Sequence, residues 1–165
     1  MTQEIQSPYV NLGKAFQLCV GYLIMFIAIS CTINMSSQVM MDDGFGNLGF
    51  YTVGLVYLMG GVTGFFAPSI VNRLGNKVCL VIAGAFNCMW LISNIFAAIK
   101  HEYPDLDSVI VRAPFVYTVG IIASLINGFG VTVMNVAQGN YVSLCATEET
   151  KGLYFSLFWM FYMGA

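Results

Sequence analysis

Four long stretches of this chain contain no aspartate, glutamate, lysine or arginine, and apolar residues dominate each of them. They cover residues 15–41, 44–72, 78–99 and 113–147. A helix needs about 20 apolar residues to cross a hydrocarbon layer roughly 30 Å thick, so each stretch is long enough to span a bilayer. A further apolar run follows Lys151 and reaches Ala165. The pattern predicts an all-α integral membrane protein, with the lipid bilayer as its first partner.

The overall composition points the same way and excludes several other classes of protein. Hydrophobic residues make up 58% of the chain and charged residues 8%, whereas soluble domains carry about 25% charged residues. The net charge of −2 is too small to indicate nucleic acid as a partner. The five cysteines form no C-x-x-C pair and do not cluster with the lone histidine, His101. We therefore expect no metal site, no cofactor and no disulfide.

The chain also lacks the residue patterns of a catalytic site. No nucleophile–base pair and no phosphate-binding loop can be found in it. No aspartate, glutamate, lysine, arginine or histidine lies within the first four apolar stretches, although proton-coupled carriers usually need an ionisable group at membrane depth. We expect no catalytic residues and no enzyme activity.

The apolar stretches predict the positions of the membrane helices. We expect helices over about 15–36, 50–71, 78–99 and 114–137, and a fifth that starts near 152 and is truncated at the end of the chain. The cations between these helices set the orientation. Four of them (Lys14, Arg73, Lys77 and Lys151) fall on one side and two (Lys100 and Arg112) on the other. This distribution predicts a cytosolic N-terminus.

Several amide side chains lie inside the predicted helices, where lipid offers them no hydrogen bond. Asn34 and Gln38 share one face of the first helix, and Asn127 and Asn135 lie on the fourth. One interpretation is that they join neighbouring helices, together with the glycines of a G-x-x-x-G pattern at 60–64. The other is that Asn34, Gln38, Asn127 and Asn135 line a polar central cavity. Neither interpretation names a ligand.

The short connection after the second helix contains a more specific motif. Asn72, Arg73, Gly75 and Lys77 resemble the loop signature G-x-x-x-D-R-x-G-R-R of the major facilitator superfamily. Arg73, Gly75 and Lys77 fit that signature, whereas Pro68 replaces its first glycine, Asn72 its aspartate and Asn76 its penultimate arginine. In the superfamily this loop steadies one conformation of a transporter. The alternative is a plain turn that carries two cytosolic cations.

A second motif resembles one branch of that superfamily, the uncoordinated-93-like or ion-channel regulatory proteins. It reads A-Q-G-N-Y at residues 137–141, and it is followed by an acidic, threonine-containing loop and an aromatic helix with F-W. Gln138, Gly139 and Asn140 are its central residues. On physical grounds we expect Gln138 and Asn140 to cap the end of the fourth helix and Gly139 to permit a bend there.

The resemblance implies a twelve-helix, two-lobed fold of the major facilitator type. Residues 1–165 would then form part of the N-terminal lobe, with only the first four to five transmembrane helices present. It also implies a protein that regulates or chaperones another membrane protein, such as an ion channel. Its partners would be other membrane proteins or the missing C-terminal helices. A small-solute transporter of the same superfamily and a small structural subunit of a membrane complex are the alternatives.

Overall fold

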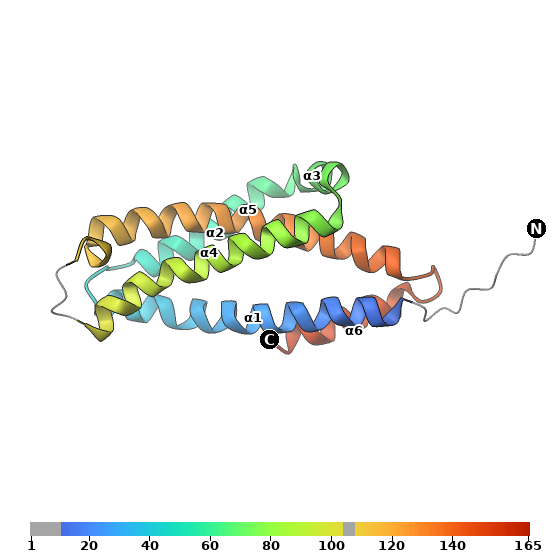
Figure 1. Cartoon of the computed structure of the whole chain (residues 1–165), viewed down its shortest axis with the longest axis horizontal. Coiled ribbons are helices and arrows are strands. Elements are labelled where there is room, and N and C mark those ends of the chain that lie inside the picture. Colours follow the sequence, from blue (N-terminus) through green and yellow to red (C-terminus); the bar gives the residue numbers. More distant parts are fainter. Residues whose placement is uncertain (1–10, 104–107) are drawn as a thin grey trace, which may run out of the picture. The chain divides into compact units, whose positions relative to one another are not determined.

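The computed structural model describes residues 11–103 and 108–165, and all regular secondary structure in these ranges is helical (Figure 1). The helices are α1 (Leu12–Asp42), α2 (Leu48–Gly64), α3 (Ala67–Leu74), α4 (Asn76–Glu102), the short 3₁₀ helix η1 (Val109–Val111), α5 (Ala113–Cys145) and α6 (Lys151–Met163). The chain divides into two compact units. Unit 1 joins the segment before Ile29 to Gln138–Ala165, and unit 2 is Ile29–Ala137.

Three of the helices are long and apolar enough to cross a membrane. They are α1 with 31 residues, α4 with 27 and α5 with 33, and the bent pair α2–α3 raises the number to four if it forms one span. This confirms the prediction of an all-helical membrane protein. The 13 residues of α6 extend over about 20 Å, which is less than the thickness of the hydrocarbon layer.

The prediction of one continuous helix over residues 50–71 is wrong. The structure breaks it after Gly64, and α3 leaves α2 at an angle of 70°. Pro68 explains the break, because it has no N–H to donate to the carbonyl of Gly64 and its ring would collide with that carbonyl. Proline is well tolerated in the first turn of a helix, and Pro68 lies in the first turn of α3.

The first and fourth helices are longer than predicted. The first ends at Asp42 rather than near residue 36, and α5 ends at Cys145 rather than near residue 137. Neither helix meets a proline in the added turns, and helical hydrogen bonds satisfy the backbone where lipid cannot. Gly44 and Gly46, with φ of 80° and 55°, form the turn that follows α1, since positive φ is readily available to glycine.

Unit 2 is held together by helices that approach one another closely at small residues. Figure 1 shows α2 beside α5, and a Cβ atom added at Gly128 of α5 would overlap the carbonyl oxygen of Val56 and lie 2.9 Å from Cβ of Met59. A Cβ added at Gly49 of α2 would lie 2.5 Å from Cα of Ser37 in α1. Both glycines are therefore required by the backbone spacing.

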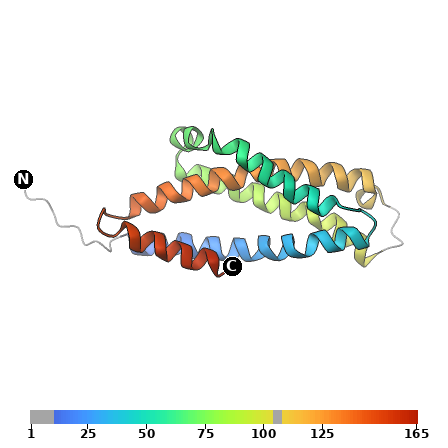
Figure 2. The same cartoon turned by 180° about the vertical axis from the view of Figure 1, so that it is seen from behind.

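Unit 1 is held together by aromatic rings. The first turns of α1 run beside α6 (Figure 2), and three ring pairs join them. The ring centroids are 5.4 Å apart for Phe16–Phe161, 5.1 Å for Tyr22–Phe158 and 4.7 Å for Phe26–Tyr162. All three pairs have the tilted, edge-to-face arrangement that aromatic quadrupoles favour. Tyr154 of α6 is fully buried among Ala15, Val142 and Cys145.

Candidate functional site

The loop motif at 72–77 forms a tight corner between α3 and α4. Gly75 ends α3 and precedes α4, with φ of 82° and ψ of 153°. Its N–H donates to the carbonyl of Val71 over 2.8 Å. Only glycine adopts this region of backbone space without strain, which explains why the motif needs glycine at this position.

The polar side chains of this corner point outward. Asn72, Arg73 and Lys77 are all exposed, and neither cation makes an ion pair with another described residue. Arg73 lies in the last turn of α3, where a cation is favoured by the helix dipole. The corner therefore presents two cations that are free to contact lipid headgroups or a partner.

The second motif does not have the geometry that the sequence predicts. Gln138, Gly139 and Asn140 lie within α5, several residues before its end at Cys145, so they do not cap the end of the helix. Gln138 is buried, and its Nε2 has no hydrogen-bond partner in the described part of the chain. A Cβ at Gly139 would meet nothing within 4 Å. The predicted capping role is wrong because the helix continues past the motif.

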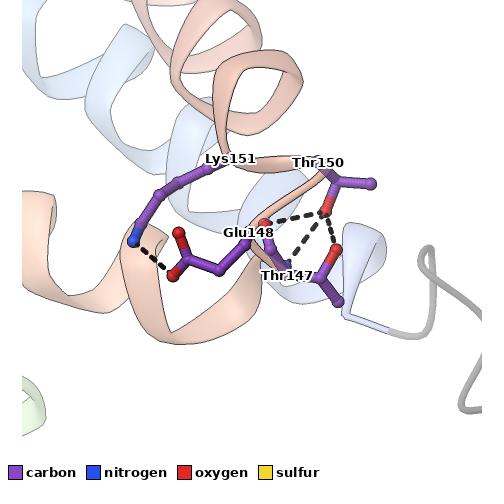
Figure 3. A network of polar contacts seen from close by, with 4 residues as sticks. All are labelled: Thr147, Glu148, Thr150 and Lys151. Carbon is purple, nitrogen blue, oxygen red and sulfur yellow. Dashed lines mark hydrogen bonds and ion pairs between the residues drawn. The ribbon is translucent and has the colours of Figure 1, made fainter.

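The threonines of the following turn bond to each other rather than to either helix end (Figure 3). The backbone N–H of Thr147 donates to Oγ1 of Thr150 over 3.0 Å, and the two threonine hydroxyls lie 2.9 Å apart. Nζ of Lys151 lies 2.9 Å from Oε1 of Glu148 on the exposed side of the turn. Glu148 and Glu149 precede α6, where carboxylates suit the positive end of the helix dipole. This network fixes the chain between α5 and α6 within unit 1.

The four amides proposed for a central cavity have different environments. Asn127 is buried, and its Oδ1 has no partner in the described part of the chain. Asn34, Gln38 and Asn135 are exposed. The cavity hypothesis for these four residues stays a prediction, and the structure separates one buried amide from three that face outward.

A buried polar seam joins α4 to α5 within unit 2. Nε1 of Trp90 donates to Oγ of Ser124 over 3.2 Å. Nδ2 of Asn87 donates to the carbonyl of Ala83 over 2.9 Å and lies 3.8 Å from Sδ of Met134. The bond to Ala83 lies within α4, whereas the contacts with Ser124 and Met134 join α4 to α5. Polar contacts between helices of this kind stabilise membrane bundles, and here they come from residues other than the four proposed for a cavity.

Unit 2 also contains a cavity of about 290 Å³ between the second half of α1 and α4. Its lining is mainly apolar and includes Met35, Leu91 and Ile95, with Ser36 and Asn94 as polar members. None of the four predicted cavity amides lines it. Sequence reasoning missed this cavity because the spacing of residues along one helix does not show which neighbouring helix it faces.

One ion pair ties the α1–α2 turn to the end of α4. Nδ1 of His101 lies 2.9 Å from Oδ1 of Asp43, although the two residues are 58 positions apart. Both lie beyond the charge-free stretches 15–41 and 78–99. The hydrogen bond to the Asp43 carboxylate, with the added charges of Asp43, Asp42 and Glu102, raises the pKa of His101 above its usual value. The sequence shows these residues but not their contact.

The described features define a multi-pass α-helical membrane protein, and no cluster of three or more potential metal ligands occurs among the residues that the structure describes. A comparison with protein families gives a match to the ion channel regulatory protein UNC-93 over residues 46–164. The matched region runs from the turn before α2 almost to the end of α6, well over half of the chain. The chain therefore belongs to the UNC-93 family of ion channel regulatory proteins. No characterised protein and no solved structure gives a significant match.

Proposed function

We propose that this chain regulates another membrane protein, an ion channel in the first instance, by binding it through membrane helices. The observation that carries the proposal is membership of a family described as ion channel regulators, over residues 46–164. The role fits a chain whose helices bear no charged group at membrane depth. Regulation through helix contacts needs packing surfaces and amides rather than an ionisable centre.

The exposed faces of the helices support a binding role. Gly54, Gly61 and Gly64 of α2 have no heavy atom near the position of a Cβ, so a partner helix can approach the backbone there. Small residues of this kind are enriched where membrane helices meet. The surface would accept helices of a channel or further helices of this protein's own fold.

The fold that we propose for the complete protein is of the major facilitator type, with this chain in its N-terminal lobe. The corner at Gly75 supports it, because Arg73, Gly75 and Lys77 fit the superfamily's loop signature and lie at a tight turn between two helices. We further propose that the N-terminus and this corner face the cytosol, which follows from the distribution of cations.

Electrical recording tests the proposed function. The chain is co-expressed with each of a panel of potassium channels, and whole-cell current and the number of channels at the cell surface are measured together. An unrelated multi-pass membrane protein at the same expression level serves as the control. We expect the whole-cell current of at least one channel to change. A change in the current carried by each surface channel would indicate an effect on gating, and a change in the number of surface channels would indicate chaperoning. Unchanged current and surface number throughout would contradict the proposal.

Transport by the chain is the second candidate, and the exposed amides Asn34, Gln38 and Asn135 favour it, because they could face a polar path. Proteoliposomes that contain the purified chain separate the two functions. Saturable uptake of a small solute without any channel present would show that the chain is a transporter and would contradict the proposed regulatory function. A complex of fixed stoichiometry with another membrane protein, without any effect on current, would favour the remaining alternative, a structural subunit.

A further inference from the structure

Two buried amide oxygens, one on α4 and one on α5, lack a hydrogen-bond donor. Asn87 is 0% exposed and Asn127 is 2% exposed, and Oδ1 of each has no partner in the described part of the chain. Nδ2 of Asn87 donates to the carbonyl of Ala83, which fixes the orientation of that amide and directs its Oδ1 elsewhere. A buried acceptor without a donor is destabilising, because folding removes the water that it would otherwise bind.

The contacts between α4 and α5 place both amides at the same interface within unit 2. The two helices run in opposite directions (Figures 1 and 2). Trp90 bonds to Ser124, and Asn87 contacts Met134. Asn127 lies three residues after Ser124 and seven before Met134. Seven residues make almost two complete turns, so Asn127 shares the face of Met134 and lies between the two points where α5 contacts α4.

Both amides lie near the middle of the membrane-spanning part of their helices. Asn87 is within two residues of the midpoint between Lys77 and Lys100. Asn127 is three residues before the midpoint of the charge-free stretch 113–147. Each is therefore within about 5 Å of the middle, whereas the hydrocarbon layer extends roughly 15 Å to either side. Lipid supplies no donor, and the burial of both side chains within unit 2 leaves no surface that a further helix could approach.

We infer that the α4–α5 interface binds an internal water molecule that donates to Oδ1 of Asn87 and to Oδ1 of Asn127. Water has two donor hydrogens, so one molecule can satisfy both acceptors. Buried waters in proteins bond to otherwise unsatisfied polar groups of this kind. A metal cation is a poorer match, because the stretches 78–99 and 113–147 contain no carboxylate that would balance its charge.

This water extends the polar seam of Trp90 and Ser124 by one helical turn. A water bridge is nearly as favourable in enthalpy as a direct hydrogen bond, so the two asparagines join α4 to α5 without bonding to each other. The bridge also gives the centre of unit 2 a polar contact that carries no charge. Polar contacts between helices stabilise membrane bundles.

Met134 is a reporter for this water. Its Sδ lies 3.8 Å from Nδ2 of Asn87, and its side chain is 2% exposed. An X-ray pulse converts water molecules into hydroxyl radicals where they lie, and a radical formed beside a methionine sulfur oxidises it to the sulfoxide. The full chain in lipid nanodiscs is irradiated, and the sulfoxide at each methionine is measured by mass spectrometry.

Met40 is the matched control, because it is 3% exposed and belongs to an apolar cluster. It lies two residues before Asp42 at the end of α1 and lines the apolar cavity, so access from bulk water alone would favour oxidation of Met40. We expect the opposite result, with Met134 oxidised several-fold faster than Met40.

Asn127→Leu tests the proposed water site directly. It removes one acceptor with a side chain of similar size, and it does not alter the contact of Asn87 with Met134. Oxidation of Met134 should fall to the level of Met40. Asn135→Leu removes an exposed amide from the same helix and should leave the oxidation unchanged. The wild-type comparison of Met134 with Met40 needs no variant, so it tests the inference even if Asn127→Leu does not fold.

Three results would overturn the inference. Oxidation of Met134 no faster than that of Met40 would show that no water lies beside it, and undiminished oxidation in Asn127→Leu would place the water elsewhere. Oxidation of Met134 that differs between sodium chloride and choline chloride would assign the two oxygens to a cation. The inference does not depend on channel regulation, since the oxidation is measured without any channel.

Discussion

Unit 1 and unit 2 are packed in opposite ways. In unit 1 large rings fill the space between α1 and α6, and three ring pairs lie 4.7 to 5.4 Å apart. In unit 2 glycines bring backbones into contact, and a hydrogen bond joins α4 to α5 between Trp90 and Ser124. Water does not drive helices together inside a bilayer, so each unit must gain its stability from contacts.

The difference predicts different sensitivities. A unit packed by rings loses stability when a ring is removed and tolerates added volume at its edges. A unit packed by glycines loses stability when a methyl group is added and tolerates the loss of exposed rings. Amide exchange measured separately for α6 and for α4–α5 distinguishes damage to one unit from damage to both.

The largest effect is expected from Phe158→Ala in unit 1. The Phe158 side chain is 3% exposed and contacts Tyr22, so its removal leaves a cavity and should lower the free energy of unfolding by about 3 kcal/mol. Trp159→Ala is the matched control, because Trp159 is 54% exposed. Thermal unfolding in mild detergent measures both. Equal effects of the two variants would show that ring burial does not stabilise unit 1.

Gly128→Ala should give the next largest effect and tests unit 2. The added methyl group overlaps the Val56 carbonyl, which forces α2 and α5 apart and should destabilise the protein by about 2 kcal/mol. Gly139→Ala on the same helix meets nothing within 4 Å and should stabilise by up to about 1 kcal/mol, since alanine is the better helix former. The prediction fails if both substitutions shift the melting temperature in the same direction.

Ser124→Ala should have a smaller effect. It removes the acceptor for the buried Trp90 indole N–H, and hydrogen bonds between membrane helices contribute about 0.6 to 2 kcal/mol. Ser93→Ala is the control, because Ser93 donates to the carbonyl of Trp90 in its own helix rather than to a neighbouring helix of the described chain. Tryptophan fluorescence and unfolding measured together should change for Ser124→Ala. If Ser93→Ala is equally destabilising, the bond across α4 and α5 has no special role.

The smallest expected effect is a dependence of local stability on pH at the Asp43–His101 pair. The pKa of His101 is raised in the folded chain, mainly by its hydrogen bond with Asp43. The contribution to stability is therefore complete below the unfolded pKa of about 6.5 and is lost as the pH rises through the higher folded value.

Amide exchange in residues 39–48, measured across that pH range, checks this dependence. Asp42 and Glu102 are the further charged groups that act on His101, and Asp105 and Asp107 lie outside the described residues. His101→Gln should remove the dependence, while Lys100→Gln should retain it. A wild-type profile that matches His101→Gln would contradict the assignment.

The sequence predicts which segments form helices better than it predicts where they end or bend. The charge-free stretches locate α1, α4 and α5 because bilayer thickness sets a minimum length. They do not locate the break after Gly64. Pro68 lies inside an apolar run, and hydropathy does not show that its backbone lacks an N–H. The stretches also do not show that α5 continues past Gln138. Glutamine and asparagine occur both inside helices and at helix ends, so their presence does not mark where a helix stops.

The candidate site shows the same limit more strongly. The turn at Gly75 is predicted in position, because the motif is local, whereas its positive φ comes from the structure. The amides at 34, 38, 127 and 135 are chosen by depth alone, and depth does not determine the direction of a side chain. Burial of Asn127 and exposure of Asn34 depend on which helices are neighbours, and the contact of Asp43 with His101 depends on a fold that no short motif encodes.

Reconstitution with a purified channel tests the central claim most directly. A potassium channel selected by the electrical recordings is placed in liposomes with increasing amounts of this chain, and channel-mediated rubidium flux is measured. The account predicts a flux that changes and then saturates at a fixed ratio of chain to channel, with no flux from the chain alone. Flux that is independent of the chain at every ratio, or solute flux through the chain without the channel, would contradict it.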